Sequence, residues 1–219
     1  MEYLPIFLAA SLAWLFTLLA VPFTDGIRNI SRRKNFIRLC DAELKLLQGR
    51  LAATAFRLVG RFGEYDEEFL SWYVRSARKS GLEVKIVELV EKCLLRATEE
   101  AIFELSESMK AKSGALVLPS RLSLSFLVTN LDSLKLFDVA VQRQVVDILT
   151  QLSFFNSAVD EAWFFYTKTF DVSLTKDDRA AINSNLQSNY GNMTDRARWI
   201  SDRIDALGHN KKFQTNRSK

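Results

Sequence analysis

Residues 36–62 read FIRLCDAELKLLQGRLAATAFRLVGRF, and their apolar side chains recur in steps of four, four, three, four, four, three and four residues. This spacing keeps the apolar side chains on one narrow face of a helix over almost four heptads. The basic residues fall mostly off that face. We therefore expect one long helix that buries the following seam: Phe36, Cys40, Leu44, Leu47, Leu51, Ala55, Leu58 and Phe62.

Upstream, residues 3–23 read YLPIFLAASLAWLFTLLAVPF and carry no charge. Twenty-one helical residues span about 31 Å, which matches the hydrocarbon thickness of a bilayer. The stretch therefore predicts a single N-terminal transmembrane helix. Pro22 is expected to close it, because proline lacks the N–H that a helix interior needs. Residues 24–26 then read as a turn or as the cap of a second helix.

A cleaved signal peptide is the competing interpretation of this stretch. Signal peptides begin with basic residues and have an apolar core of about 7–15 residues. Here the chain starts Met-Glu, and the apolar run is longer. An uncleaved anchor is favoured on these grounds.

The basic residues after the anchor predict its orientation. None precedes the span, whereas five follow within fifteen positions: Arg28, Arg32, Arg33, Lys34 and Arg38. Positive residues stay on the cytoplasmic side, so the N-terminus should lie outside and the C-terminal domain should be cytoplasmic. The same five side chains are candidates for contact with anionic headgroups, although they could act as a topology signal alone.

Small residues recur along the span at Ala9, Ala13, Thr17 and Ala20. Such a stripe lets two transmembrane helices approach closely and form a weak dimer. Alanine is also common in spans that do not pair, so both interpretations stay open.

The remaining chain reads as helices. Residues 64–81, 82–112 and 138–170 are expected to be helical, and a capping box at Thr175 and Asp178 begins the last helix. Apolar side chains at helical spacing predict a buried seam on each of the last three of these helices. The seams are Val87, Val90, Leu94, Ala97, Ala101 and Leu105; Val141, Val145, Ile148, Leu152, Phe155, Val159, Ala162, Tyr166 and Phe170; and Ile182, Leu186, Tyr190, Met193, Ala197, Ile200, Ile204 and Leu207. The alternating pattern at residues 115–130 fits either a strand or a helix, and helix is favoured because a lone strand has no partner. The predicted fold is all-α, a transmembrane helix followed by an antiparallel bundle of about four to five helices. The expected regions are the anchor 1–25, the basic juxtamembrane segment and stalk helix 26–63, the bundle domain 64–207, and a flexible basic tail 208–219.

Charge is unevenly distributed along the chain. The net charge is +4, but residues 24–63 hold nine Lys/Arg against three Asp/Glu, and the tail adds four more Lys/Arg. The bundle domain between them is mildly acidic. A basic isoelectric point alone would favour nucleic-acid binding, but this distribution does not, and no nucleic-acid partner is expected.

The inventory of reactive side chains is sparse. The only histidine is His209, in the predicted tail, whereas His-based catalysis needs the ring inside a structured cleft. Cys40 and Cys93 have no paired spacing and read as buried, reduced thiols. The two side chains of an acid pair such as Asp160–Glu161 point to different sides of a helix, so no such pair forms a two-carboxylate site by itself. An enzyme that uses carboxylates alone stays open as an alternative. We expect no catalytic site, metal or cofactor.

The run Trp163-Phe164-Phe165-Tyr166 is the most unusual side-chain cluster of the bundle. Core packing is the simplest interpretation. However, four bulky side chains cover nearly all sides of one helical turn, so at least one should be exposed. This makes the run a candidate partner surface.

Two functions of different classes fit these patterns. The first is a non-enzymatic, single-pass membrane-anchored interaction protein, such as an adaptor or a subunit of a membrane-associated complex. It would bind a protein partner or form a homo-oligomer. The alternative is a membrane-tethered lipid- or small-ligand-binding sensor, with a cavity lined by residues such as Phe154, Phe155, Trp163 and Tyr166.

Overall fold

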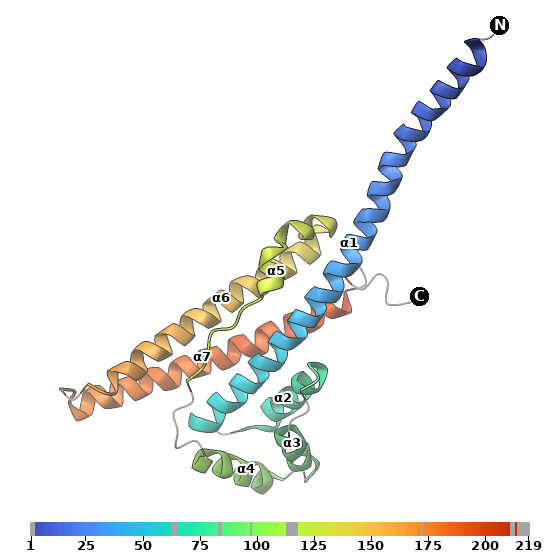
Figure 1. Ribbon diagram of the computed structural model, residues 1–219. Coiled ribbons are helices and arrows are strands. Elements are labelled where there is room, and N and C mark those ends of the chain that lie inside the picture. The colour runs from blue at the N-terminus through green and yellow to red at the C-terminus, as the bar shows by residue number, and fades with distance from the viewer. Residues whose placement is uncertain are drawn as a thin grey trace.

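The chain forms a long helix that continues into a helical bundle (Figure 1). A computed structural model describes residues 3–62, 65–82, 85–96, 98–112, 118–171, 173–210 and 213. Within these ranges, the side chains of residues 3–13, 15–23, 25, 62, 111 and 112 are not described. The described residues form helices and connections without strands, so the all-α prediction is confirmed.

Seven α-helices and one 3-10 helix (η1) make up the part of the chain that the structure describes. Three are long, and the others are short connections or side elements. Their bounds are α1 Tyr3–Phe62, α2 Glu67–Lys79, α3 Lys85–Arg96, α4 Glu99–Lys112, α5 Ser125–Thr129, η1 Leu131–Leu136, α6 Val139–Lys168 and α7 Lys176–His209.

Helix α1 is continuous over 60 residues, or about 90 Å. The break expected at Pro22 and residues 24–26 does not occur. A proline removes one backbone hydrogen bond, and the other hydrogen bonds of the helix continue through Pro22 and through the weak helix formers that follow it, residues 23–26. The uncharged stretch and the bundle therefore belong to one helix.

No helix in the part of the chain with described side chains is both long and apolar enough to cross a membrane. The transmembrane part of the expected fold gains no support from this finding. The predicted packing face, Ala9, Ala13, Thr17 and Ala20, lies outside the described side chains.

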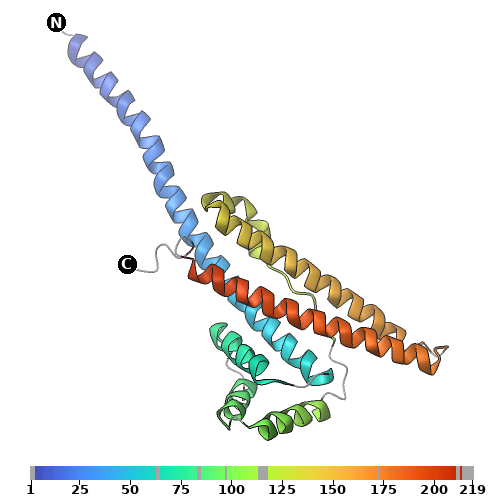
Figure 2. The same cartoon turned by 180° about the vertical axis from the view of Figure 1, so that it is seen from behind.

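Helices α1, α6 and α7 form the main body (Figures 1 and 2). Helices α2 and α4 cover the opposite side of α1, and α3 packs against both of them (Figure 1). Side-chain hydrogen bonds link α7 to both of the other long helices. Gln48 of α1 donates to Ser201 of α7, and Arg196 of α7 donates to Gln151 of α6. The order of colours along each ribbon in Figure 1 shows that α7 runs antiparallel to both α1 and α6.

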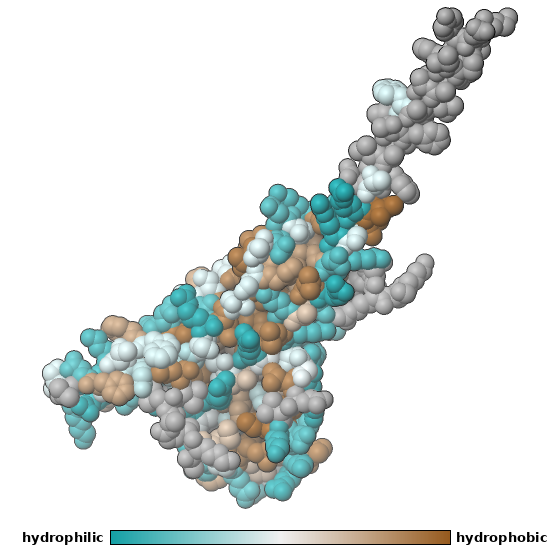
Figure 3. Space-filling model, viewed as in Figure 1, coloured by the Kyte–Doolittle hydropathy of each residue, from teal (hydrophilic) through white to brown (hydrophobic). Residues whose placement is uncertain are grey.

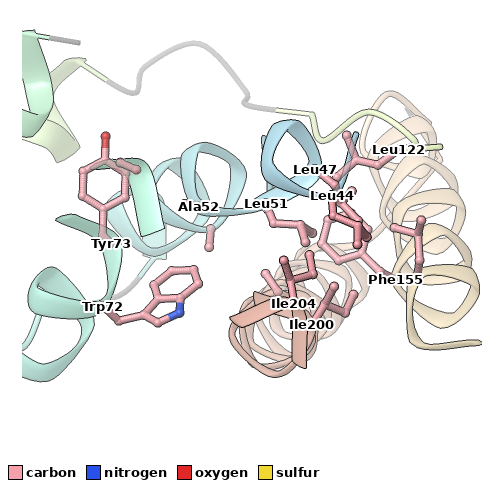
Figure 4. Packing of buried hydrophobic residues seen from close by; sticks show 14 of the residues in the cluster. Leu44, Leu47, Leu51, Ala52, Trp72, Tyr73, Leu122, Phe155, Ile200 and Ile204 are labelled. Carbon is pink, nitrogen blue, oxygen red and sulfur yellow. The ribbon is translucent and has the colours of Figure 1, made fainter. Parts of the chain in front are cut away.

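The seam of α1 lies at the centre of the core. All its members from Phe36 to Leu58 are buried, as the heptad spacing predicts, and the Phe62 side chain lies outside the described ones. Figure 4 shows Leu44, Leu47 and Leu51 pointing towards Phe155 of α6 and towards Ile200 and Ile204 of α7. On the other side of α1, Trp72 of α2 lies near Ala52.

A buried polar cluster joins three helices within this core. The Gln48 amide donates to the Ser201 hydroxyl at 2.9 Å and to Asp205 Oδ1 at 3.1 Å. The Ser76 hydroxyl of α2 lies 3.0 Å from that of Ser201. Because buried polar groups are costly without partners, this cluster favours one register of α1, α2 and α7 over shifted ones.

The prediction of a single helix over residues 82–112 is wrong. The structure has α3 and α4 instead, with Thr98 accepting from the backbone N–H of Ala101 at 3.2 Å. The reason is local, because a threonine followed by Glu99 and Glu100 makes a helix start that competes with continuation. Upstream, Gly81 ends α2 as expected, with a positive φ of 74°.

Residues 118–124 connect α4 to α5 without regular structure. Residues 115–117 of the ambiguous segment lie outside the described residues. In its described part, helix begins at Ser125 and not at the expected cap, Ser120. The cap comes from α1 instead, since Glu43 accepts the backbone N–H groups of Phe126 and Leu127 at 2.8 and 2.9 Å. A residue more than eighty positions away is not visible to local sequence patterns.

The last two helices begin and end close to their expected positions. Helix α7 starts with the complete Thr175–Asp178 capping box. Beyond its end, Phe213 is buried and packs on Phe137 with ring centroids 5.8 Å apart. This part of the predicted flexible tail is therefore attached to the bundle, whereas residues 211–212 and 214–219 lie outside the described ones.

Candidate functional site

The aromatic residues at the end of α6 form the main candidate site. Trp163 and Phe164 are 45% and 57% exposed, and Phe165 and Tyr166 are half-buried. Phe170 joins them, with its ring 4.9 Å from that of Tyr166 in an edge contact. We call these five residues the aromatic end.

Phe170 corrects the expected seam of the 138–170 helix. That seam is buried from Val141 to Ala162, but Tyr166 is half-buried and Phe170 is 66% exposed. The cause is the length of α1, because the α6–α7 hairpin projects beyond the end of α1 (Figures 1 and 2). Beyond the end of α1, only α7 is left to cover the apolar face of α6, so the aromatic side chains at this end of α6 reach the surface.

The aromatic end is held in place by specific contacts. The Trp163 indole donates to the backbone carbonyl of Pro119 at 3.1 Å. The Lys168 ammonium lies 5.5 Å from the centre of the Phe164 ring, a cation–π distance. The rings of Trp163 and Tyr166 meet edge to face. A pre-ordered aromatic surface loses little entropy when a partner binds.

The five basic residues of the predicted membrane contact do not share one environment. Arg28, Arg32, Lys34 and Arg38 are exposed, and hydrophilic surface gathers where α1 leaves the bundle (Figure 3). Arg33 instead turns to the bundle, with its guanidinium 5.1 Å from the centre of the Phe137 ring. Four of the five side chains are thus free to meet a headgroup layer.

The largest of four described hollows has a volume of about 880 Å³ and lies between α4 and the start of α2. Sequence reasoning missed it, because Glu67 and the pair Glu99–Glu100 fall on two different expected helices, 64–81 and 82–112. The fold brings them together beside exposed Phe103. Five carboxylates line this acidic hollow: Asp66, Glu67, Glu99, Glu100 and Glu104.

None of these four hollows is lined by Phe154, Phe155, Trp163 or Tyr166. Phe155 is fully buried and fills the core between the long helices. The geometry thus gives the sensor alternative no specific support.

The two cysteines are buried, whereas the only histidine is exposed. Cys40 and Cys93 are free and buried, and burial together with the nearby Glu43 and Asp41 carboxylates raises the pKa of the Cys40 thiol to about 12. His209 is exposed at the end of α7. Within the described residues, no three His, Cys, Asp or Glu side chains gather in a metal-binding group.

No protein-family model, no curated protein and no solved structure matches the chain significantly, so its function is inferred from its own residues.

Proposed function

We propose that this chain is a non-enzymatic, single-pass membrane-anchored protein whose helical bundle binds another protein, as an adaptor or a subunit of a membrane-associated complex. The anchor is the uncharged stretch 3–23, and the five basic residues after it favour a cytoplasmic bundle. Because α1 is continuous, the bundle is attached to the anchor without a flexible linker.

The aromatic end is the observation that carries this proposal. Isolated exposed apolar side chains are ordinary, but a contiguous aromatic surface on a projecting hairpin is typical of an interaction site. Aromatic side chains bury a large area with few rotatable bonds, which is why they dominate binding hot spots.

The chemistry of the remaining side chains supports binding rather than catalysis. Cysteine attacks as a thiolate, and burial holds the Cys40 thiol protonated at neutral pH. The Cys93 pKa is also raised, mainly by burial. The exposed position of His209 offers no enclosed pocket for acid–base chemistry.

Self-association belongs to the same proposal. The stripe Ala9, Ala13, Thr17 and Ala20 would permit two spans to pair, placing two bundles side by side at the membrane. A parallel pair would present two aromatic ends and raise the avidity for a dimeric partner.

The direct test places a photocrosslinking amino acid at Phe164 of the full chain, expressed in cells of its source. The matched control carries the same amino acid at Phe103, an equally exposed phenylalanine of α4. We expect an adduct of defined mass from position 164, lost when Phe170→Ser is added, and no such adduct from position 103. Equal adducts from both positions, or none from position 164, would contradict a partner at the aromatic end.

A further inference from the structure

We propose that the corner formed by residues 125–139 is a second membrane contact, which docks the bundle onto an anionic bilayer surface. This membrane corner comprises α5, η1 and the first residue of α6. The inference rests on the proposed anchor and adds a contact that the sequence did not indicate. A bilayer is the occupant argued here, and a second copy of the chain is an outcome of the test.

The membrane corner is fixed to α1 close to the predicted exit from the bilayer. The Phe36 ring lies 5.8 Å from that of Phe126 and 5.4 Å from that of Phe137. The Glu43 carboxylate caps α5 through two backbone hydrogen bonds. The corner therefore moves with α1 as one body, at the end of the bundle that faces the N-terminal half of that helix (Figure 1).

The distance to the bilayer follows from helix geometry. Arg33, which packs on Phe137 of the corner, is ten residues after Phe23, the last residue of the uncharged stretch. Ten residues of continuous helix span about 15 Å. A headgroup layer covers roughly 5–8 Å of that distance, and a tilt of about 20°, common for single spans, lowers one side of the bundle further.

The corner exposes aliphatic side chains. Val128 and Leu131 are exposed, and Val139 is 68% exposed. On the facing part of α1, Ile27 and Ile30 are exposed as well. Aliphatic side chains next to basic ones are typical of surfaces that lie in the membrane interface.

Charge favours the same orientation. Arg28, Arg32, Lys34 and Arg38 are exposed at this end. The acidic hollow is lined by α4 and the start of α2, and α4 lies at the opposite end of the bundle (Figure 1). An anionic surface attracts the first end and repels the second.

Two acidic residues of the corner itself do not oppose this attraction strongly. Asp132 pairs with Lys135 at 2.9 Å. Asp138 caps α6 by accepting the backbone N–H of Val141 at 2.9 Å.

The test uses the full chain with Cys40→Ala and Cys93→Ala and a spin label at Leu131→Cys. The protein is reconstituted into vesicles of phosphatidylcholine with about a quarter phosphatidylserine. The measurement compares the collision rates of the label with oxygen and with a water-soluble nickel complex. Val139→Cys provides a second corner position, and Leu95→Cys, at an exposed site on α3, is the matched control.

We expect the label at positions 131 and 139 to collide more often with oxygen than with the nickel complex, and the label at position 95 to do the reverse. In vesicles of phosphatidylcholine alone, the difference between the two collision rates at positions 131 and 139 should be smaller. Labels at 131 and 139 that are as water-exposed as the control, on a chain that floats with the vesicles, would overturn the docking and leave the anchor intact. Equal shielding in detergent without lipid would assign the corner to a second copy and also overturn it. A chain that does not float with the vesicles would contradict the proposed anchor itself.

Discussion

At the scale of single residues, burial controls the chemistry of the two cysteines. Cys40 is completely buried on the α1 seam, and its pKa of about 12 reflects the loss of water around a would-be thiolate, helped by the nearby Glu43 and Asp41 carboxylates. Cys93 is buried on α3. Since only the thiolate reacts at a useful rate, both side chains should behave as small apolar core residues.

We predict that Cys40 is not alkylated in the folded protein. With a pKa of about 12, roughly one molecule in ten thousand carries the thiolate at about pH 8. Iodoacetamide followed by mass spectrometry should therefore modify Cys40 only after unfolding in urea. Modification at the same rate in the folded and unfolded states would contradict the burial of Cys40, and a disulfide to Cys93 would contradict both the burial and a cytoplasmic bundle.

At the scale of the helix, periodicity predicted which faces are buried, and local signals predicted several ends. The seams of α1, α6 and α7 follow from spacing alone, because one apolar stripe must find a core. The capping box of α7 is equally visible in the sequence. Within α3 and α4, the break at Thr98 was available as a signal but was outweighed by a seam that happens to continue across it.

Features that depend on distant residues could not be predicted in this way. Phe170 continues the α6 seam in sequence, yet it is exposed because α1 ends before the hairpin does. The start of α5 depends on Glu43, and the acidic hollow depends on how α4 folds back towards α2. Each of these depends on tertiary arrangement, which a single sequence without homologues does not reveal.

Two helical glycines differ in the space that a methyl side chain would find around them. Gly49 of α1 faces the end of α2, and a Cβ there would lie 2.6 Å from the Ser80 hydroxyl oxygen and 2.9 Å from Ser80 Cβ. Gly191 of α7 has open space around it.

We predict that Gly49→Ala lowers the free energy of unfolding by about 1–2 kcal/mol, because overpacking outweighs the gain in helix propensity. Gly191→Ala, the matched control, should raise it by about 0.5–1 kcal/mol, because it gains helix propensity without a clash. Urea unfolding followed by circular dichroism measures both. A stabilising Gly49→Ala would contradict the close contact between α1 and α2.

At the scale of the whole molecule, the N-terminal half of α1 extends away from a helical bundle (Figure 1). Helix α1 begins in the uncharged stretch and continues without a break into the bundle, so a tilt or rotation of the proposed anchor would be transmitted to the bundle. Hydrophilic side chains gather where α1 leaves the bundle (Figure 3), and the acidic hollow lies between α4 and the start of α2. The aromatic end lies on the hairpin that projects beyond the end of α1 (Figure 1). This polarity fits a protein held at a membrane surface while it presents a binding hairpin.

The central claim is that residues 3–23 stay in the bilayer with the bundle on the cytoplasmic side. The most direct measurement places one epitope before Met1 and another after Lys219, and treats intact cells with a protease that cannot cross membranes. We predict that the first epitope is removed, the second survives, and the chain stays in the membrane pellet after alkaline carbonate. A chain that carbonate releases, or a C-terminal epitope that the protease destroys, would contradict the account.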